Sequence, residues 1–125
     1  ALQGKKTYST WEEGLLQIFE AVYENKAFIM NAYNSLSREQ IENFLFRLTH
    51  DLIMGVVEER SVGTSITEAQ KNFIADFYKY SFVGILLDWI HQGMKADYTS
   101  ICTDMCTTLH GNISNSIKNF TNSTE

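Results

Sequence analysis

One segment, from Thr67 to Gly93, is apolar around nearly its whole circumference when it is read as a helix. A helix that is apolar on every side has to be buried on every side. A chain of 125 residues can hardly enclose one of its own helices completely, so a second subunit is the economical cover. The alternative is a helix at the centre of a monomeric bundle. The large apolar side chains of the segment are Phe73, Ile74, Phe77, Tyr78, Tyr80, Phe82, Val83, Ile85, Leu86, Leu87, Trp89 and Ile90.

Capping signals mark the starts of the helices that we expect. Thr10 to Glu13, Ser37 to Gln40 and Thr67 to Gln70 each place a hydroxyl three residues before a Glu or Gln. Such a capping box satisfies two backbone amides at the start of a helix. Asp97 is expected to be a further N-cap. Gly93 predicts the end of the apolar helix, because glycine readily adopts the left-handed conformation found there.

Between these signals, apolar residues recur three to four positions apart, and the chain contains no proline to interrupt a helix. The spacing predicts an all-α fold of about five helices, three of them long, in a single domain over residues 1–125. A short helix is expected from Lys26 to Tyr33. The stripe from Tyr98 to Phe120 predicts one long last helix.

The last two long helices are expected to form a four-helix bundle with the same pair from a second subunit. Gly84 costs helix stability, which makes sense if two helices approach closely at that point. We therefore predict a homodimer. Its candidate interface residues are Ser81, Gly84, Leu87, Cys102, Met105, Cys106, Leu109 and Ile113.

Charge and composition exclude several classes of protein. The chain carries 15 acidic and 10 basic residues, a net charge of −5, and its bases do not cluster, so this segment is a poor binder of polyanions. No apolar run approaches the roughly 18–20 residues that span a bilayer, so no membrane partner is expected. The two cysteines are only four residues apart, which suggests a reducing compartment. We expect a cytoplasmic protein.

The stretch from Phe73 to Met94 carries a more specific pattern. It has an aromatic start at Phe77 and Tyr78, small residues at Ser81 and Gly84, and the ending Trp-Ile-His-Gln-Gly-Met at 89–94. This pattern resembles the penultimate helix in the C-terminal domain of TetR-family transcriptional regulators. The branch that it resembles has a domain similar to that of the dihydroxyacetone kinase activator DhaS. The short segment over residues 23–33 matches as well, and the resemblance covers most of residues 11–117.

The resemblance implies a function. In this family an N-terminal helix-turn-helix domain binds operator DNA as a dimer, and the C-terminal helical domain dimerises and in many members takes up a small effector. Nothing before Thr10 resembles a basic three-helix unit. We therefore expect the regulatory domain alone, with operator DNA bound only through an N-terminal domain absent from this chain.

An apolar small-molecule effector needs a mostly apolar pocket with a few polar groups. For each aromatic residue, the alternative is ordinary core packing. For His50, the alternative is a histidine in the core or at its rim with a backbone partner. The candidate pocket residues are Tyr23, Tyr33, Phe44, His50, Met54, Phe77, Tyr78 and Trp89.

Other chemistry finds little support in the chain. Cys102, Cys106 and His110 are spaced four residues apart, but eight residues of helix rise about 12 Å, so the outer two cannot share one ion. We expect no metal and no cofactor. The chain has no Gly-rich phosphate loop, no G-x-S-x-G and no H-E-x-x-H motif, so we expect no enzyme.

Two other functions remain open at this point. The chain could be a regulatory module that binds a protein partner and no small molecule. It could also be a secreted, cytokine-like helical bundle, since Asn112, Asn119 and Asn122 each begin an Asn-x-Ser/Thr triplet. The absence of cysteines that could form long-range disulfides argues against the secreted alternative.

Overall fold

A computed structural model describes residues 8–122, and over this range it confirms the all-α fold class. None of its helices is both long and apolar enough to cross a membrane within that range. The described helices are α1 (Tyr8–Glu24), α2 (Lys26–Tyr33), α3 (Arg38–Arg60), α4 (Glu68–His91), α5 (Tyr98–Leu109) and α6 (Asn112–Asn122).

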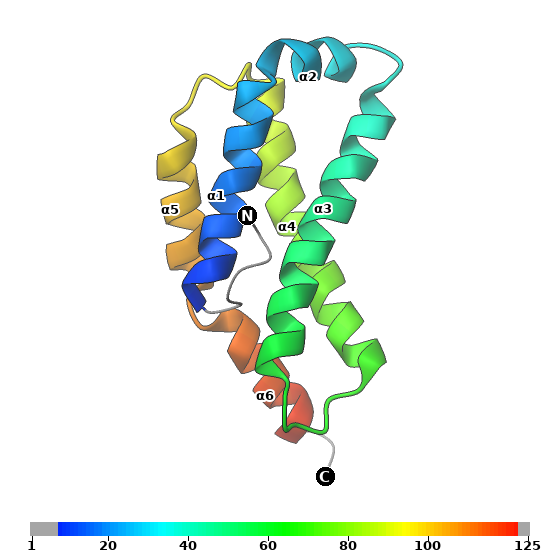
Figure 1. Cartoon of the computed structure of the whole chain (residues 1–125), viewed down its shortest axis with the longest axis vertical. Coiled ribbons are helices and arrows are strands. Elements are labelled where there is room, and N and C mark those ends of the chain that lie inside the picture. The colour runs from blue at the N-terminus through cyan, green and yellow to red at the C-terminus, as the bar shows by residue number, and fades with distance from the viewer. Residues whose placement is uncertain (1–7, 123–125) are drawn as a thin grey trace.

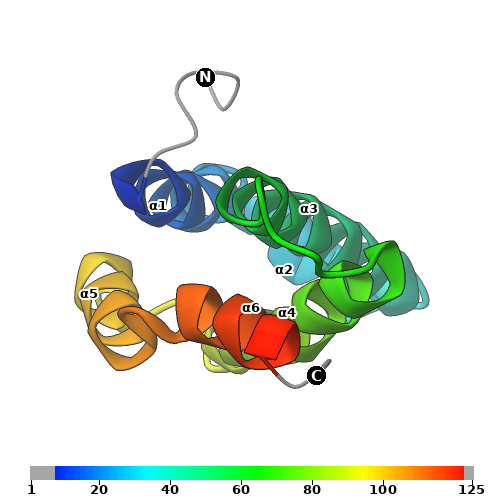
Figure 2. The ribbon, with the colours of Figure 1, turned by 90° about the horizontal axis from the view of Figure 1, so that it is seen from below.

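The helices form two layers (Figure 2). One layer holds α1 and α3, and the other holds α5, α6 and α4. Figure 1 shows α2 crossing one end of the bundle and α6 lying at the opposite end, against α3 and α4. The longest packed contact is between α3 and α4, while α1 packs on both α3 and α5.

The core lies between the two layers and is built from the apolar stripes of the sequence. α1 and α3 supply one side of it, and α4, α5 and α6 supply the other. Its most deeply buried large side chains include Trp11, Leu15, Phe19, Leu45, Ile53, Val57, Phe82, Val83, Leu86, Ile90 and Ile113.

Both predicted ends of α4 are confirmed. The Thr67 hydroxyl accepts the Gln70 backbone N–H at 3.1 Å, and the Gln70 side-chain oxygen accepts the Thr67 N–H at 3.0 Å. At the other end, Gly93 has φ +86, and the N–H groups of Met94 and Gly93 bond to the carbonyls of Trp89 and Ile90, each at 2.9 Å. These two bonds form a Schellman motif.

The Trp89 side chain ties this end of α4 to the chain that follows it. Its indole N–H donates to the Ala96 carbonyl at 3.0 Å. Met94 is buried and adopts φ 56, an uncommon conformation for a residue with a Cβ. The Trp-to-Met ending quoted above is thus a device that stops the helix and turns the chain toward α5.

Two other predicted starts differ from the structure. The predicted cap at Thr10 is wrong, because α1 begins at Tyr8; the Thr10 side chain lies outside those described. The capping box at Ser37 is also absent, since Ser37 has φ −87 and ψ 6 and its side chain makes no cap bond. Ser35 takes over: its hydroxyl oxygen accepts the Ser37 N–H at 3.1 Å, and its carbonyl accepts the Arg38 N–H at 3.3 Å.

Asp97 caps α5 as predicted. Its carboxylate accepts the Thr99 N–H at 3.1 Å and the hydroxyls of Thr99 and Ser100 at 2.8 and 3.1 Å. The Thr99 hydroxyl, then the Thr99 amide and the Ser100 hydroxyl, lower the pKa of the Asp97 carboxyl. These bonds stabilise the ionised carboxylate, which is the form that caps the helix.

The stripe from Tyr98 to Phe120 is divided into α5 and α6, where one helix was expected. The chain breaks at Gly111, which has φ +80. Beyond the break, Ile113 and Ile117 are buried in the core. The Tyr78 hydroxyl lies 3.1 Å from that of Ser116. The apolar spacing continues through the break, so periodicity alone could not reveal the change of axis.

The two predicted capping residues, Thr67 and Ser37, give a matched test, because only Thr67 forms a capping box in the structure. Thr67→Ala should lower the free energy of unfolding by about 1 kcal/mol, because the α4 capping box is lost. Ser37→Ala should change it by less than about 0.5 kcal/mol, since the Ser37 side chain caps nothing. Urea denaturation at one protein concentration measures both values. Equal losses in the two variants would contradict this account of the caps.

A second test concerns the end of α4. Gly93→Ala should lower the free energy of unfolding by about 1–2 kcal/mol, because a Cβ is disfavoured at positive φ. The added Cβ itself would meet only the Lys95 side chain, at 3.5 Å. Gly93→Asn is the control and should lose less, because asparagine tolerates this conformation better. Chemical denaturation of the two variants should separate them, and an alanine variant as stable as the parent would refute the strain.

Candidate functional site

One face of α4 is not covered by this chain. Its opposite face is buried against the other helices, as expected for a helix in the second layer. On the uncovered face, Phe73, Phe77 and Tyr80 are 61, 59 and 61% exposed, and Ile85 is 40% exposed. These residues follow each other at helical spacing. We call this face the α4 stripe, and it consists of Phe73, Phe77, Tyr80, Ser81, Gly84 and Ile85.

The α4 stripe continues into a shallow groove between α4 and α5, of about 230 Å³. The two helices run antiparallel (Figure 1), and the chain leaves Gly84 open, with no atom within 4 Å of an added Cβ. Contiguous exposed apolar surface of this kind is a candidate interaction site. The groove is lined by Ser81, Phe82, Ile85, Ile101, Asp104, Met105, Thr108 and Leu109.

The residues predicted for a dimer interface divide between this face and the core. Ser81 and Gly84 lie on the α4 stripe, and Leu109 lines the groove beside it. Met105 also borders this groove, but its side chain is buried in the core. The other four lie elsewhere: Leu87 packs against the core, Cys102 and Ile113 are buried in it, and Cys106 faces α1. The predicted interface did not include Phe73, Tyr80 and Ile85, which lie on the α4 stripe, or Ile101, which lines the groove beside it.

A second and larger groove runs between α1 and α5. Its volume is about 800 Å³, within the range of sites that hold small molecules. We call it the α1/α5 groove. It is lined by Glu12, Glu13, Leu16, Thr99, Cys102, Thr103, Cys106, Thr107 and His110.

The floor of the α1/α5 groove is apolar, and its two cysteine thiols, Cys102 and Cys106, are unreactive. Burial, followed by the neighbouring Cys106, raises the pKa of the Cys102 thiol to about 12. Burial, followed by the Glu12 carboxylate, raises the pKa of the Cys106 thiol to about 11. Both cysteines are free, and both stay protonated near neutral pH, so they act as small apolar packing groups.

The spacing of Cys102, Cys106 and His110 does place all three along this one groove. Within residues 8–122, no group of three or more His, Cys, Asp or Glu side chains is arranged to hold a metal ion.

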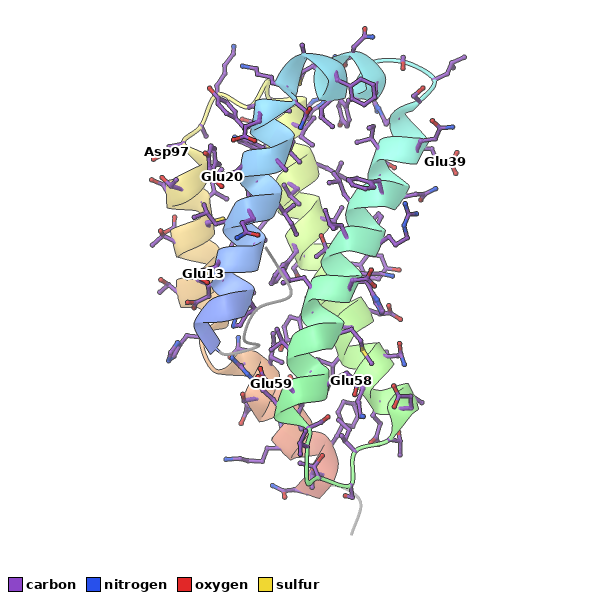
Figure 3. All side chains as sticks on the ribbon, in the orientation of Figure 1. Glu13, Glu20, Glu39, Glu58, Glu59 and Asp97 are labelled. Atoms are coloured by element: carbon purple, nitrogen blue, oxygen red, sulfur yellow. The ribbon has the colours of Figure 1, made fainter. Side chains whose placement is uncertain are left out.

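All the charged residues in the two helices that form the α1/α5 groove are acidic. α1 and α5 contain no lysine or arginine. Figure 3 labels Glu13, Glu20 and Asp97 along the line where α1 and α5 run side by side. Glu12 lies on the same wall as Glu13, so two carboxylates border the groove directly.

The eight predicted pocket residues do not line either groove. Tyr23 and Trp89 belong to an aromatic cluster with Phe19 and Tyr98, in which ring centroids lie 5.2–6.4 Å apart. Tyr33 is buried, its hydroxyl 3.5 Å from His91 Nδ1. These three aromatic residues therefore pack at the end of the bundle near α2.

The remaining five lie along α3 and α4. Phe44 is exposed and Met54 is half-buried. His50 Nε2 lies 3.6 Å from the Asp76 carboxylate on α4. Phe77 is on the α4 stripe, and the Tyr78 ring meets it edge-on at 5.2 Å.

Comparison with known proteins agrees with the helical architecture. Residues 9–111 match the model of a TetR-type family described as "Transcriptional regulator C-terminal region". Neither a curated protein nor a solved structure gave a significant match.

The state of the two thiols can be measured directly. At pH 8 the folded chain should react with Ellman's reagent at least about tenfold more slowly than the urea-unfolded chain, because a raised pKa leaves little thiolate. The rate should rise with pH toward the pKa of about 11 for Cys106. Cys102→Ser and Cys106→Ser assign the signal to each thiol. A folded chain that reacts as fast as the unfolded one would contradict the burial of both.

Proposed function

The chain belongs to the TetR family of transcriptional regulators, as a C-terminal region of that family, and we propose that it is a dimerising, effector-sensing domain without enzymatic activity. Operator DNA would be bound by an N-terminal helix-turn-helix domain of the parent protein, which would work in the cytoplasm. The α4 stripe is the single observation that carries this proposal.

Dimerisation follows from the cost of leaving the α4 stripe in water. Three aromatic side chains and Ile85 are exposed together on one helix face, and their burial is worth roughly 25 cal/mol per Å² of apolar surface. A two-fold contact would place the α4 stripe of one subunit against that of its partner. Ser81 and Gly84 would allow the two α4 helices to approach closely.

Effector sensing is proposed for the α1/α5 groove. At one end of α1, the Phe19 ring stacks on Tyr98 at 6.4 Å and meets Trp89 edge-on at 5.2 Å. Toward its other end, Glu12, Glu13 and Leu16 border the open groove. The cluster would thus act as a fixed point about which the beginning of α1 shifts when the groove is filled.

Such a shift would reach the DNA-binding domain through α1. A ligand changes the populations of two arrangements only if it binds one of them better. A groove filled on the α5 side of α1 would favour the arrangement in which the two helices stand further apart. In a dimer, this changes the spacing of the two recognition helices.

The dimer is tested by sedimentation with a matched pair of variants. The parent chain should be a dimer at micromolar concentration, and Phe77→Glu should be a monomer, because it places a charge in the apolar contact. Phe28→Glu is the control: Phe28 is 69% exposed but lies on α2, away from the α4 stripe, so this variant should remain a dimer. A monomeric parent would overturn the proposal, and so would a Phe77→Glu dimer.

A further inference from the structure

The described residues that line the α1/α5 groove present few hydrogen-bond donors. On one wall, the Glu12 and Glu13 carboxylates accept only. On the other wall, the Thr99 hydroxyl donates to Asp97 at 2.8 Å, and the Thr103 hydroxyl donates to the Thr99 carbonyl at 2.9 Å. Both protons are therefore already donated to acceptors of this chain, and these two hydroxyls offer a ligand only their oxygen lone pairs. The Thr107 hydroxyl and His110, farther along α5, are the polar groups of the lining that are not accounted for in this way.

Charge narrows the choice of ligand further. No lysine or arginine is among the described residues that line the groove, and none occurs in α1 or α5. The Arg60 guanidinium on α3 acts electrostatically on Glu12, but Arg60 is not among the described residues that line the groove, so an anionic ligand in the groove would meet the two carboxylates first. A cation would gain charge-assisted hydrogen bonds from the same two groups.

The apolar floor of the α1/α5 groove determines what the uncharged part of the ligand must be. Leu16, Cys102 and Cys106 form an apolar surface along the groove, and both thiols are neutral at physiological pH. A ligand that covers this floor needs an apolar body, since a small hydrated ion would leave it bare.

From the size, the charge and the small number of donors, we propose that the α1/α5 groove binds an organic cation: an amine or guanidinium group carried on an apolar body. The ammonium or guanidinium group would lie between Glu12 and Glu13 on α1 and the threonine oxygens on α5. This assignment deepens the proposed effector role and rests on it, but cation binding can be measured without reference to dimerisation.

The test is a titration of the isotopically labelled chain, followed by NMR, with 4-phenylbutylamine and with its neutral analogue 4-phenylbutan-1-ol. The amine should bind at least about tenfold more tightly, equal to about 1.4 kcal/mol. Its shift changes should centre on the amides of Leu16, Thr103 and Thr107. The preference should shrink in about 0.5 M salt, which screens exposed carboxylates.

Variants separate a specific site from general attraction of a cation to an acidic protein. Glu12→Gln with Glu13→Gln should reduce amine binding to the level of the alcohol. Glu39→Gln with Glu42→Gln removes the same charge from α3 and should leave the affinity within about twofold, because these two residues do not line the groove. Thr103→Arg places a cation in the groove and should abolish amine binding while the circular dichroism spectrum is preserved.

Several outcomes would overturn the assignment. Equal affinity for amine and alcohol would leave only an apolar groove. Equal effects of the two double variants would leave only bulk electrostatics. Binding of a short amphipathic leucine-lysine peptide without binding of the amine would assign the groove to a protein segment. If the chain is a dimer but does not bind the amine, only the cation-binding proposal is refuted. If the chain is a monomer and binds the amine, only the proposed dimer is refuted.

Discussion

The apolar helix α4 needs more cover than the described part of the chain provides, although three other helices pack directly along it. α3 runs along most of one side of it, α6 closes over its beginning, and α2 meets its end. These contacts bury Ile74, Phe82, Leu86 and Ile90, but they use up the apolar faces that one chain of this length can offer. The remaining side of α4 therefore stays open, and an exposed apolar surface is the physical consequence of an apolar helix with too few neighbours.

Much of the fold could be predicted because its signals are local. The Thr67 capping box and the Gly93 turn each depend on a few adjacent residues, and both are present as predicted. Ser37 begins the same capping-box pattern as Thr67, yet the neighbouring Ser35 hydroxyl accepts the Ser37 backbone N–H. In a capping box, that N–H would bond to the side chain of Gln40 instead. The break at Gly111 also stayed hidden, because Ile113 and Ile117 keep the helical spacing of α5 across a change of direction.

The candidate site was harder to predict, because it depends on which helices are neighbours. An open apolar face on α4 could be expected from the surplus of apolar residues in that helix. The residues beside it could not, since Cys102 and Ile113 belong to the apolar stripe from Tyr98 to Phe120 yet lie in the core. The α1/α5 groove joins Glu12 and Thr103, which are far apart in the sequence. One sequence signal could have pointed to this groove. The segments 8–24 and 98–109, which pack side by side in the structure, both lack lysine and arginine.

The break at Gly111 between α5 and α6 also allows the two helices to differ in their local stability. α6 is held by Ile113 and Ile117 and by side-chain hydrogen bonds such as that from Arg60 to Ser114, at 3.2 Å, while α5 is held by α1. Because the backbone changes axis at Gly111, α6 can detach as a unit without unwinding α5. Amide hydrogens of the two helices then exchange with solvent through separate opening events.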